Sequence, residues 1–521
     1  MGRVRGDAPR LDRVFGSPSP TSRAAPLRMR PRTVVAPDPR LPRTAPDGTE
    51  AVVVGGGIAG VSAAVVLAER GVAVTLLEAA PTLGGRLGAW PHTLPDGTEQ
   101  VVEHGFHAFF RHYYTWRAIL RRLDPELGFL RPVGGYPVLS RTWAPEDLTG
   151  LPAAPPLNLL ALFARSPSLG LGDLVGSDTG LASELLAYDR DRTTARFDDV
   201  PAAEFLAGLG MSDRAQAMLF EAFARSFFAQ PKALSAAELI AMFHYYFLGN
   251  PEGIGFDAPD TDYLTCIWGP LRAYLERRGV RVRTGTPVRA LHPADRWRVE
   301  TDEGAFETRH VVLAVDPGAL KALVGASSVA AELARQADAC AVAPPFAVAR
   351  LWLDRDVDLA RPVFNAVSRE PTLDSVTVYS RLERPSAEWA ARTDGAVVEL
   401  HSYACTAPDA ATATDRMRAE LSALWPETAD ARVLHEQVRF EATAPTFPPG
   451  AAGTRPRVTG AAPGVRIAGD HVDPPYLCGL MERAALTGVL AANDVLAEVG
   501  VREEPVRGVP QRGLLAGWRV S

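Results

Sequence analysis

A glycine-rich turn between an apolar run and a helical run is the feature that most constrains this chain. Residues 50–71 read EAVVVGGGIAGVSAAVVLAERG, and a second β-type run, VAVTLLEA, follows at 72–79. A strand, a turn, a helix and a strand in this order form a βαβ unit. Gly55, Gly57 and Gly60 give the G-x-G-x-x-G spacing that brings backbone close to a pyrophosphate at a helix N-terminus. The sequence therefore predicts a dinucleotide site.

Two further features favour FAD over a nicotinamide dinucleotide. Glu78 ends the second predicted strand, where a carboxylate accepts hydrogen bonds from the ribose hydroxyls of the adenosine half. A second glycine turn, Gly84 and Gly85, then carries Arg86. An arginine on a second loop suits the pyrophosphate of a long, extended cofactor. We therefore expect FAD as the cofactor.

Together with the late stretch RIAGDHVDPPYLCGLMERAALTG (466–488), these motifs resemble the FAD-dependent amine-oxidase and carotenoid-desaturase superfamily. The resemblance spans about residues 50–500. It implies that Asp470 binds the ribityl and phosphate region of FAD, that Val288 packs on adenine and that backbone near Met481 lies against the flavin. The implied FAD contacts are Gly55, Gly57, Ile58, Ala59, Gly60, Glu78, Ala79, Gly84, Gly85, Arg86, Val288, Gly469, Asp470 and Met481.

The resemblance also implies an α/β fold. A Rossmann-type FAD-binding domain, of the two-dinucleotide-binding, amine-oxidase-like kind, would carry an inserted α+β substrate domain. The middle, 105–260, lacks alternation and is predicted to be mainly helical, whereas runs at 346–355, 396–404 and 433–442 predict strands of another sheet. The expected division is a disordered Arg- and Pro-rich tail (1–47), the FAD-binding domain (48–104, 262–322 and 456–500), the substrate-binding domain with a helical cap or membrane-facing part (105–261 and 323–455) and a C-terminal tail (501–521).

The stretch EHGFHAFFRHYYTW (103–116) is dense in histidines and aromatic residues. A metal site is disfavoured, because the histidines share one segment and have no clear carboxylate partner beyond Glu103, so we expect no metal. The segment resembles the G-[FL]-H-x-F-F pattern of plant- and cyanobacterial-type carotene desaturases. By that resemblance His107 is the candidate flavin-proximal base or orienting residue. The alternative is a histidine that only makes structural hydrogen bonds.

The combined motifs look most like the carotenoid ring desaturase/methyltransferase group, the isorenieratene synthase-like enzymes that turn a β-ionone ring into an aromatic φ-ring. The implied activity is that of an FAD-dependent oxidoreductase converting β-carotene into an isorenieratene-type product. Because C1 of the ring carries two methyls and no hydrogen, hydride loss must be followed by a methyl shift from C1 to C2 and by proton loss. FAD accepts the hydride, while the protein excludes water and offers a weak base.

Other functions stay open at this point. A linear-carotene desaturase or a carotene isomerase shares every cofactor motif. A non-catalytic flavin-fold lipid-binding protein is an alternative of another class, although the presence of both Arg86 and Asp470 counts against it. Flavin amine oxidases usually rely on a lysine at the flavin, and this chain has only Lys232 and Lys321, so that branch is disfavoured.

Composition limits the partners. The net charge of −6 implies no attraction to nucleic acid. The four cysteines form no C-x-x-C pair, which argues against a thiol redox centre or an iron–sulfur cluster and fits a reducing compartment.

Because carotenoids dissolve only in bilayers, the apolar stretch 151–174 is either a peripheral membrane contact or a buried helix. The stretch AELIAMFHYYFLGN (237–250) either lines a polyene tunnel or belongs to the core. We expect a cytoplasmic protein that is peripherally associated with the membrane, binds a carotenoid and passes electrons to an acceptor such as a quinone or O2.

Overall fold

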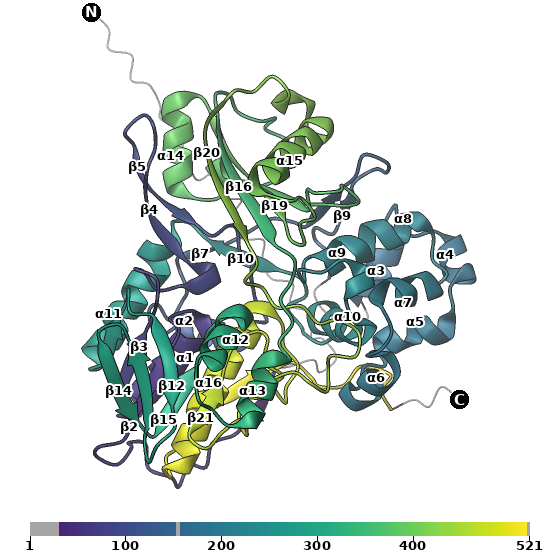
Figure 1. Ribbon diagram of the computed structural model, residues 1–521. Coiled ribbons are helices and arrows are strands. Elements are labelled where there is room, and N and C mark those ends of the chain that lie inside the picture. Colours follow the sequence, from purple (N-terminus) through teal and green to yellow (C-terminus); the bar gives the residue numbers. More distant parts are fainter. Residues whose placement is uncertain (1–30, 153–156, 518–521) are drawn as a thin grey trace, which may run out of the picture.

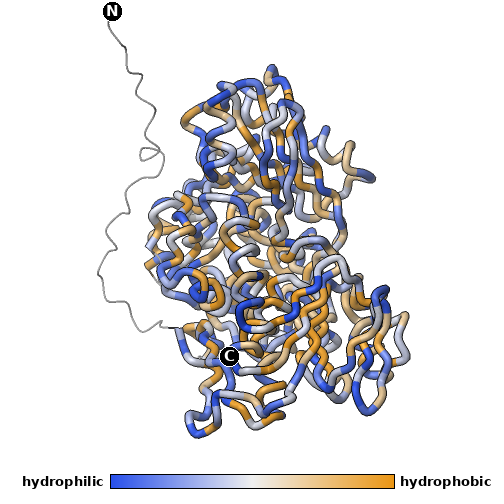
Figure 2. Tube along the Cα trace, turned by 90° about the vertical axis from the view of Figure 1, so that its left-hand side faces the viewer, coloured by the Kyte–Doolittle hydropathy of each residue, from blue (hydrophilic) through white to orange (hydrophobic). Residues whose placement is uncertain are grey.

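The computed structural model describes residues 31–152 and 157–517, arranged in three regions (Figure 1). A parallel sheet with helices on its faces forms the lower region. A mostly antiparallel sheet, in which β8 (Pro137–Leu139) and β17 (Phe364–Val367) pair in parallel, forms the upper one together with α14 (Arg384–Thr393) and α15 (Ala410–Leu424). A group of short helices lies to one side. Figure 2 shows apolar stretches running through the interior and hydrophilic residues at the outer loops.

Five parallel strands in the order β11-β3-β2-β15-β21 form the lower sheet. The strands come from distant parts of the sequence, and all lie within the three stretches from which we expected the FAD-binding domain to be built. The central strands are rich in valine and leucine and almost fully buried, as expected where helices cover both faces. Their bounds are β2 Glu50–Val54, β3 Ala73–Leu77, β11 Arg281–Arg283, β15 His310–Leu313 and β21 Val465–Ile467.

Helices α1 (Ile58–Glu69) and α16 (Leu480–Glu498) pack closely against each other beside this sheet. A Cβ atom added at Gly488 would lie 2.1 Å from the carbonyl oxygen of Ala59, so this contact requires glycine. The C-terminal helix thereby fixes the start of α1. The surrounding elements are α11 Gly269–Arg277, β12 Val288–His292, β13 Trp297–Thr301, β14 Gly304–Thr308, α12 Pro317–Gly325 and α13 Ala331–Asp338.

The upper sheet has seven strands in the order β20-β16-β19-β18-β17-β8-β9. The strands predicted at 346–355, 396–404 and 433–442 are confirmed as β16, β19 and β20. Every residue of β16 and β19 is buried, because both faces of these strands pack into apolar clusters. The bounds are β8 Pro137–Leu139, β9 Glu146–Asp147, β16 Phe346–Leu353, β17 Phe364–Val367, β18 Ser375–Val378, β19 Ala396–Ser402 and β20 Val433–Glu441.

The middle of the chain is mainly helical only from residue 157 onward. The prediction of a helical middle is wrong for most of 105–150, because short strands there pair with β10 and with the upper sheet. Besides β8 and β9, the elements within this segment are β6 Phe109–Phe110, α2 Tyr114–Leu120 and β7 Leu130–Pro132, and those that flank it or pair with it are β4 Ala89–Thr93, β5 Glu99–Glu103 and β10 Phe256–Pro259. The helices are α3 Leu157–Arg165, α4 Leu171–Gly176, α5 Thr179–Leu186, α6 Arg190–Phe197, α7 Ala202–Gly208, α8 Asp213–Ala215, α9 Ala222–Arg225 and α10 Ala236–Phe243.

The two ends of the described chain meet in a small antiparallel sheet. Strand β1 (Arg32–Val35) pairs with β22 (Val506–Gly508). The expectation of a disordered tail through residue 47 is therefore wrong for this strand, whose valines pack on the core, and residues 1–30 lie outside the described residues. Across the described ranges, no helix combines the length and apolar character needed to span a membrane.

Candidate functional site

The predicted glycine turn joins β2 to α1, and its three glycines have different roles. Gly55 has φ 105°, and a Cβ atom there would lie 2.4 Å from the carbonyl oxygen of Ala314. At Gly60 a Cβ atom would lie 1.9 Å from the carbonyl oxygen of Gly55, so this glycine lets the helix approach the turn. Gly57 differs, because a Cβ atom there would come no closer than 3.9 Å to the neighbouring atoms named for it and would project from a cavity wall. Gly57 therefore leaves room for a ligand rather than for the protein.

Glu78 lies at the end of β3 and is held by backbone. Its Oε2 accepts a hydrogen bond from the Gly56 N–H (2.5 Å), and its Oε1 accepts one from the Ala80 N–H (2.8 Å). The carboxylate is thus fixed where the second strand meets the glycine turn. This is the position expected for the group that binds a ribose.

Arg86 and Asp470 come from opposite ends of the sequence and form an ion pair, with Nη2 and Oδ1 2.5 Å apart. Burial raises the pKa of the Asp470 carboxyl and the Arg86 guanidinium lowers it, and the net effect holds that pKa below its usual value. Burial likewise opposes the charge of Arg86, but Asp470 raises the Arg86 pKa above its usual value. Both side chains therefore carry their charges into the same cavity.

This cavity of about 580 Å³, called the cofactor cavity below, brings together every predicted FAD contact except Gly60, which lies beneath the turn. The residues fit FAD on two structural grounds. The N-terminus of α1 faces the cavity at Gly57, and within the described chain no side chain caps it. The paired charges of Arg86 and Asp470 lie farther along the same wall. The predicted contacts on the wall are Gly55, Gly57, Ile58, Ala59, Glu78, Ala79, Gly84, Gly85, Arg86, Val288, Gly469, Asp470 and Met481.

The cofactor cavity is also lined by aromatic side chains from several regions of the chain. The aromatic lining residues are Phe106, Phe110, Tyr113, Tyr136, Phe223, Phe227, Phe228, Tyr246, Phe247, Phe346, Phe364 and Tyr403. Residues Tyr246 and Phe247 of the stretch 237–250 face the cavity, whereas Leu239 and Ile240 lie in the core. The core interpretation is thus right for part of the stretch, and the polyene tunnel stays a prediction. We call this part of the cavity the aromatic arm.

His107 lies on the wall of the cofactor cavity. Its Nδ1 donates to the Gly105 carbonyl at 2.8 Å, because a carbonyl can only accept, and its backbone N–H donates to the Tyr263 hydroxyl at 3.1 Å. Burial lowers the pKa of His107 to about 4. The ring is therefore neutral near pH 7 and leaves Nε2 as a proton acceptor.

The other histidines of the segment 103–116 divide between cavity and core. His104 also lines the cofactor cavity, and burial lowers its pKa to about 3. His112 is fully buried among Tyr245, Tyr246 and neighbouring aromatic rings, so it belongs to the core. Among the residues that the structure describes, no group of three or more His, Cys, Asp or Glu side chains is placed to hold a metal ion.

A carboxylate–imidazole pair on β19 was not predicted from the sequence. Glu399 Oε1 and His401 Nε2 lie 2.6 Å apart, and His401 lines the cofactor cavity. Burial raises the pKa of Glu399, but Arg350 and His401 outweigh this effect and lower the pKa to about 2. Residues two apart on a strand share a face, so the sequence E-x-H in this predicted strand was the available signal.

The Glu399 carboxylate also makes hydrogen bonds to other regions of the chain. Glu399 also accepts the Phe106 N–H (2.6 Å) and a hydrogen bond from Arg350 Nε (2.9 Å). Arg350 reaches Glu103 as well, at 2.7 Å. Glu103 is thus an ion-pair partner that holds the histidine segment against the upper sheet.

Comparison with known proteins agrees with this geometry. The sequence profile of the family described as flavin containing amine oxidoreductase matches residues 58–496. The chain is 44% identical to the carotenoid phi-ring synthase of Streptomyces griseus, covering 91% of this chain and 92% of that protein. It is 28% identical to the carotenoid phi-ring synthase of Chlorobaculum tepidum, over 90% and 91% of the two chains.

More distant similarities define the fold. The 15-cis-phytoene desaturase of Solanum lycopersicum is 23% identical, over 86% of this chain and 78% of that protein. Among solved structures, cyclohexylamine oxidase from Brevibacterium oxydans superposes with a TM-score of 0.62 at 16% identity, covering 87% of this chain and 99% of that one. The expected amine-oxidase-like α/β fold is thereby confirmed. Lys232 and Lys321 lie outside the lining of the cofactor cavity, on a short helical turn and on α12.

Proposed function

The chain belongs to the flavin containing amine oxidoreductase family, and we propose that it is a carotenoid ring desaturase/methyltransferase that forms an aromatic φ-ring from a β-ionone ring. The observation that carries this proposal is the continuity of one cavity from the expected FAD contacts to the aromatic arm. The 44% identity to a carotenoid phi-ring synthase along nearly the whole chain supports it. β-Carotene would be converted into an isorenieratene-type product.

FAD is the cofactor of this oxidoreductase family, and when bound it supplies the acceptor for a hydride. We propose that Glu78 binds the adenosine ribose, that the glycine turn at the α1 N-terminus holds the pyrophosphate and that Val288 packs on adenine. Arg86 would add a cation at the phosphates, and Asp470 would bind the ribityl chain. Met481, at the start of α16, would lie against the flavin.

The aromatic arm would hold the ring and part of the polyene. Removing a hydride near C1 leaves a carbocation, which water would quench, so the surrounding side chains must be apolar and close. Aromatic faces can also stabilise a passing positive charge through their quadrupoles. The hydroxyls of Tyr113 and Tyr246 share one hydrogen bond of 2.7 Å, so they are directed toward each other.

A base must then take the proton that completes aromatisation. His107 is our first candidate, because its Nδ1 hydrogen is bound to Gly105 and its Nε2 is free to accept. A weak base suffices, since a carbocation gives up a neighbouring proton readily. His401 is a second candidate, because the anionic Glu399 would compensate the charge of a protonated imidazole.

Helix α3 suggests how the substrate arrives. Leu157, Leu160 and Phe163 recur every three residues, and their exposed fractions are 55%, 62% and 40%. Exposed apolar residues at helical spacing, followed by Arg165, suit a helix that lies on a membrane surface. We therefore propose that α3 makes a peripheral contact with the cytoplasmic membrane face.

Expression in a β-carotene-producing bacterium, followed by pigment analysis, tests the proposed activity. An aromatic-ring carotenoid is the expected product. Unchanged β-carotene with turnover of an acyclic carotene would indicate a linear-carotene desaturase, and a changed double-bond geometry alone would indicate an isomerase. Purified protein that shows no flavin absorption after FAD is added would indicate a lipid-binding protein instead.

A further inference from the structure

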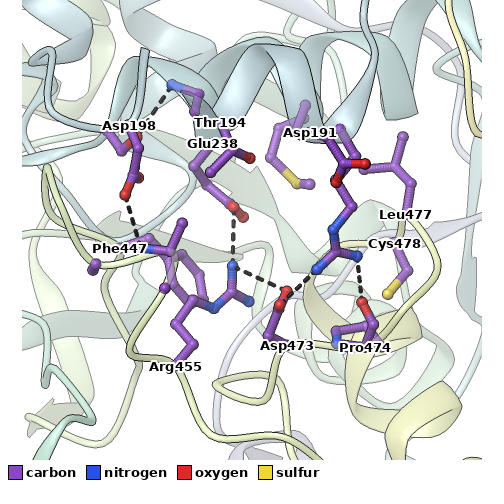
Figure 3. A pocket seen from close by; sticks show the side chains of 18 of the residues that line it. Asp191, Thr194, Asp198, Glu238, Phe447, Arg455, Asp473, Pro474, Leu477 and Cys478 are labelled. Carbon is purple, nitrogen blue, oxygen red and sulfur yellow. Dashed lines mark hydrogen bonds and ion pairs between the residues drawn. The ribbon is translucent and has the colours of Figure 1, made fainter. Parts of the chain in front are cut away.

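A second cavity, of about 350 Å³, opens beside α6 and α10 (Figure 3). Its rim includes the exposed residues Asp191 and Gly453, and its floor includes the buried side chains of Met242 and Cys478. The loop that follows Asp470 separates it from the cofactor cavity. Gly469, Asp470, Leu480 and Met481 of this connection face the cofactor cavity, whereas Asp473, Pro474, Tyr476, Leu477 and Cys478 face the second cavity.

Three arginines line the second cavity, and each is held by a carboxylate. Figure 3 shows one of them, Arg455, beside Glu238 and Asp473. Arg190 pairs with Asp473 at 2.5 Å, and Glu238 lies between Arg483 (2.6 Å) and Arg455 (3.3 Å). These ion pairs fix the guanidinium groups before any ligand arrives. Fixed guanidinium N–H groups are ready donors for the oxygen atoms of a ligand.

An apolar surface accompanies these donors. The guanidinium carbons of Arg455 and Arg483 lie 4.1 and 4.8 Å from the centre of the Phe447 ring. Met242 and Leu477 add apolar walls. A cavity of this size, with apolar walls and a few convergent donors, suits a small planar molecule that carries carbonyl oxygens.

A small third cavity, of about 10 Å³, lies between the other two. Glu238, Met242, Phe447 and Arg483 are shared between it and the second cavity, and Phe227, Phe228, Asp470 and Leu480 between it and the cofactor cavity. Phe228 and Leu480 have φ of 57° and 49°, in the left-handed region that non-glycine residues rarely adopt. Strained backbone of this kind concentrates at functional sites.

Because the third cavity shares lining residues with both of the others, one layer of side chains separates the second cavity from the cofactor cavity.

The proposed reaction requires a route by which an oxidant reaches the cofactor while the aromatic arm is occupied. Turning one β-ionone ring into a trimethylphenyl ring removes four hydrogens, as two hydrides and two protons. FAD accepts one hydride at a time, so it must be reoxidised between the two steps. During that interval the half-oxidised carotenoid still occupies the aromatic arm. The oxidant therefore needs a different approach to the cofactor.

We propose that the second cavity binds the ring of a quinone that reoxidises the cofactor while the half-oxidised carotenoid stays bound. The inference rests on the proposed function. For each hydride and proton taken from the carotenoid, the quinone gains two electrons and two protons and leaves as the hydroquinone, and FAD returns to its oxidised form. Arg455, whose buried Nε has no hydrogen-bond partner among the described residues, and Arg190 would donate hydrogen bonds to the quinone oxygens. Arg483, whose nitrogens donate to Glu238 and to backbone carbonyls, would hold the wall in place.

Filling the second cavity tests the proposal. Thr194→Trp places a large ring at its α6 wall, and Ala411→Trp, at an exposed position on α15, is the matched control. FAD-loaded enzyme would be photoreduced without substrate and mixed anaerobically with a short-chain water-soluble quinone. We expect Thr194→Trp to slow the return of oxidised flavin at least about tenfold and Ala411→Trp to leave it unchanged. Arg455→Gln offers a second variant that removes a donor without filling the cavity.

Two further readouts separate this inference from the proposed function. In a β-carotene-producing cell, Thr194→Trp should raise the ratio of half-oxidised to aromatic ring product. Wild-type reoxidation rates in both Thr194→Trp and Arg455→Gln would overturn the assignment of the cavity. Competition between quinone and carotenoid for one site, or equal slowing of reoxidation by dioxygen, would overturn it as well. The photoreduction experiment needs no carotenoid turnover, so it gives a result even if the pigment assay shows no aromatic product.

Discussion

Glu399 and His401 lie on the same face of β19 and join through a 2.6 Å contact at the wall of the cofactor cavity. The Phe106 N–H donates to the same carboxylate, so the strand and the segment that carries His107 are linked through Glu399. His107 itself hydrogen-bonds to the Gly105 carbonyl and the Tyr263 hydroxyl, so Glu399 holds the backbone beside His107 while it pairs directly with His401. Separate substitutions of the two histidines can therefore tell which of them acts as the base.

Replacing the candidate bases should impair proton removal without releasing FAD. Loss of a general base typically costs about 10²- to 10⁴-fold in rate. We expect such a loss from His107→Gln if His107 accepts the proton, and from His401→Gln if His401 does. Turnover of β-carotene and the bound-flavin spectrum would be measured for both. Wild-type turnover in both variants would rule out the pair, and His112→Gln, a core change, serves as the folding comparison.

Arg86 should contribute to FAD affinity. Arg86→Gln removes a cation from the cavity and leaves Asp470 without its ion-pair partner. A lost charged hydrogen bond costs about 1.5 to 3 kcal/mol, so we expect FAD to bind about ten- to a hundredfold more weakly. Titration of the apoprotein with FAD, followed by fluorescence, measures this change. Arg289→Gln removes an exposed arginine paired with Asp302 and should leave FAD affinity unaltered.

The cofactor half of the site could be predicted from sequence because its chemistry is encoded in short motifs. Glycine spacing, a strand-end carboxylate and a G-D pair near the C-terminus each specify a local backbone, and folding only brings them together. The Glu399 network could not be found in this way, because its partners Phe106 and Arg350 are distant in sequence. The pairing of β16 with β19 places Arg350 opposite Glu399, and Phe106 reaches the same carboxylate from the segment that follows β5.

The two wrong predictions, a helical segment at 105–150 and disorder at β1, also have physical causes. Residues 105–150 contain many aromatic residues and leucines, which suit helices and strands equally, and their partner β10 lies more than a hundred residues downstream of the first of them. The strand β1 lies in an Arg- and Pro-rich stretch whose composition suggests disorder. Its short TVV run pairs with β22, at the other end of the chain. Tertiary contacts outweighed local preference in both places.

Glu383 should make the stability of the protein pH-dependent. Burial raises the pKa of its carboxyl from 4.5 to about 7, and the weaker effect of the Arg350 guanidinium opposes this rise. A raised carboxyl pKa means that the folded state binds more protons than the unfolded state between these values, so stability falls as pH rises from about 4.5 to 7. Glu383→Gln removes this loss. The variant should gain on the order of 1–3 kcal/mol relative to the wild type over that range.

Thermal midpoints of wild type and Glu383→Gln, measured in parallel at several pH values, check this prediction. The difference between the two proteins is the useful quantity, because all other titrating groups are common to both. A difference that stays constant from pH 4.5 to 7 would show that Glu383 does not titrate in this window. Glu388→Gln, on the same helix, gives a matched control with the same chemical change.

Helix α3 should govern binding to lipid. Leu157→Glu combined with Leu160→Glu places two charges on an exposed face, so folding should change by no more than about 0.5 kcal/mol per site. We expect sedimentation with liposomes to fall several-fold. Leu359→Glu changes another exposed leucine, 84% accessible and located in the upper region, and should leave lipid binding intact. Equal binding by the double variant and the wild type would place the membrane contact elsewhere.

The glycine turn offers a matched pair of substitutions that separates cofactor binding from folding. Gly57 has extended backbone, and a Cβ atom there would project from the cavity wall without a close protein contact. Gly57→Val should therefore leave the thermal midpoint of the apoprotein unchanged and lower FAD affinity at least about a hundredfold, because the side chain occupies space that the pyrophosphate needs. At Gly60 the added Cβ atom would overlap the Gly55 carbonyl oxygen. Gly60→Ala should therefore destabilise the apoprotein by about 1–3 kcal/mol, and a Gly57→Val protein that still binds FAD tightly would contradict the proposed path of the cofactor.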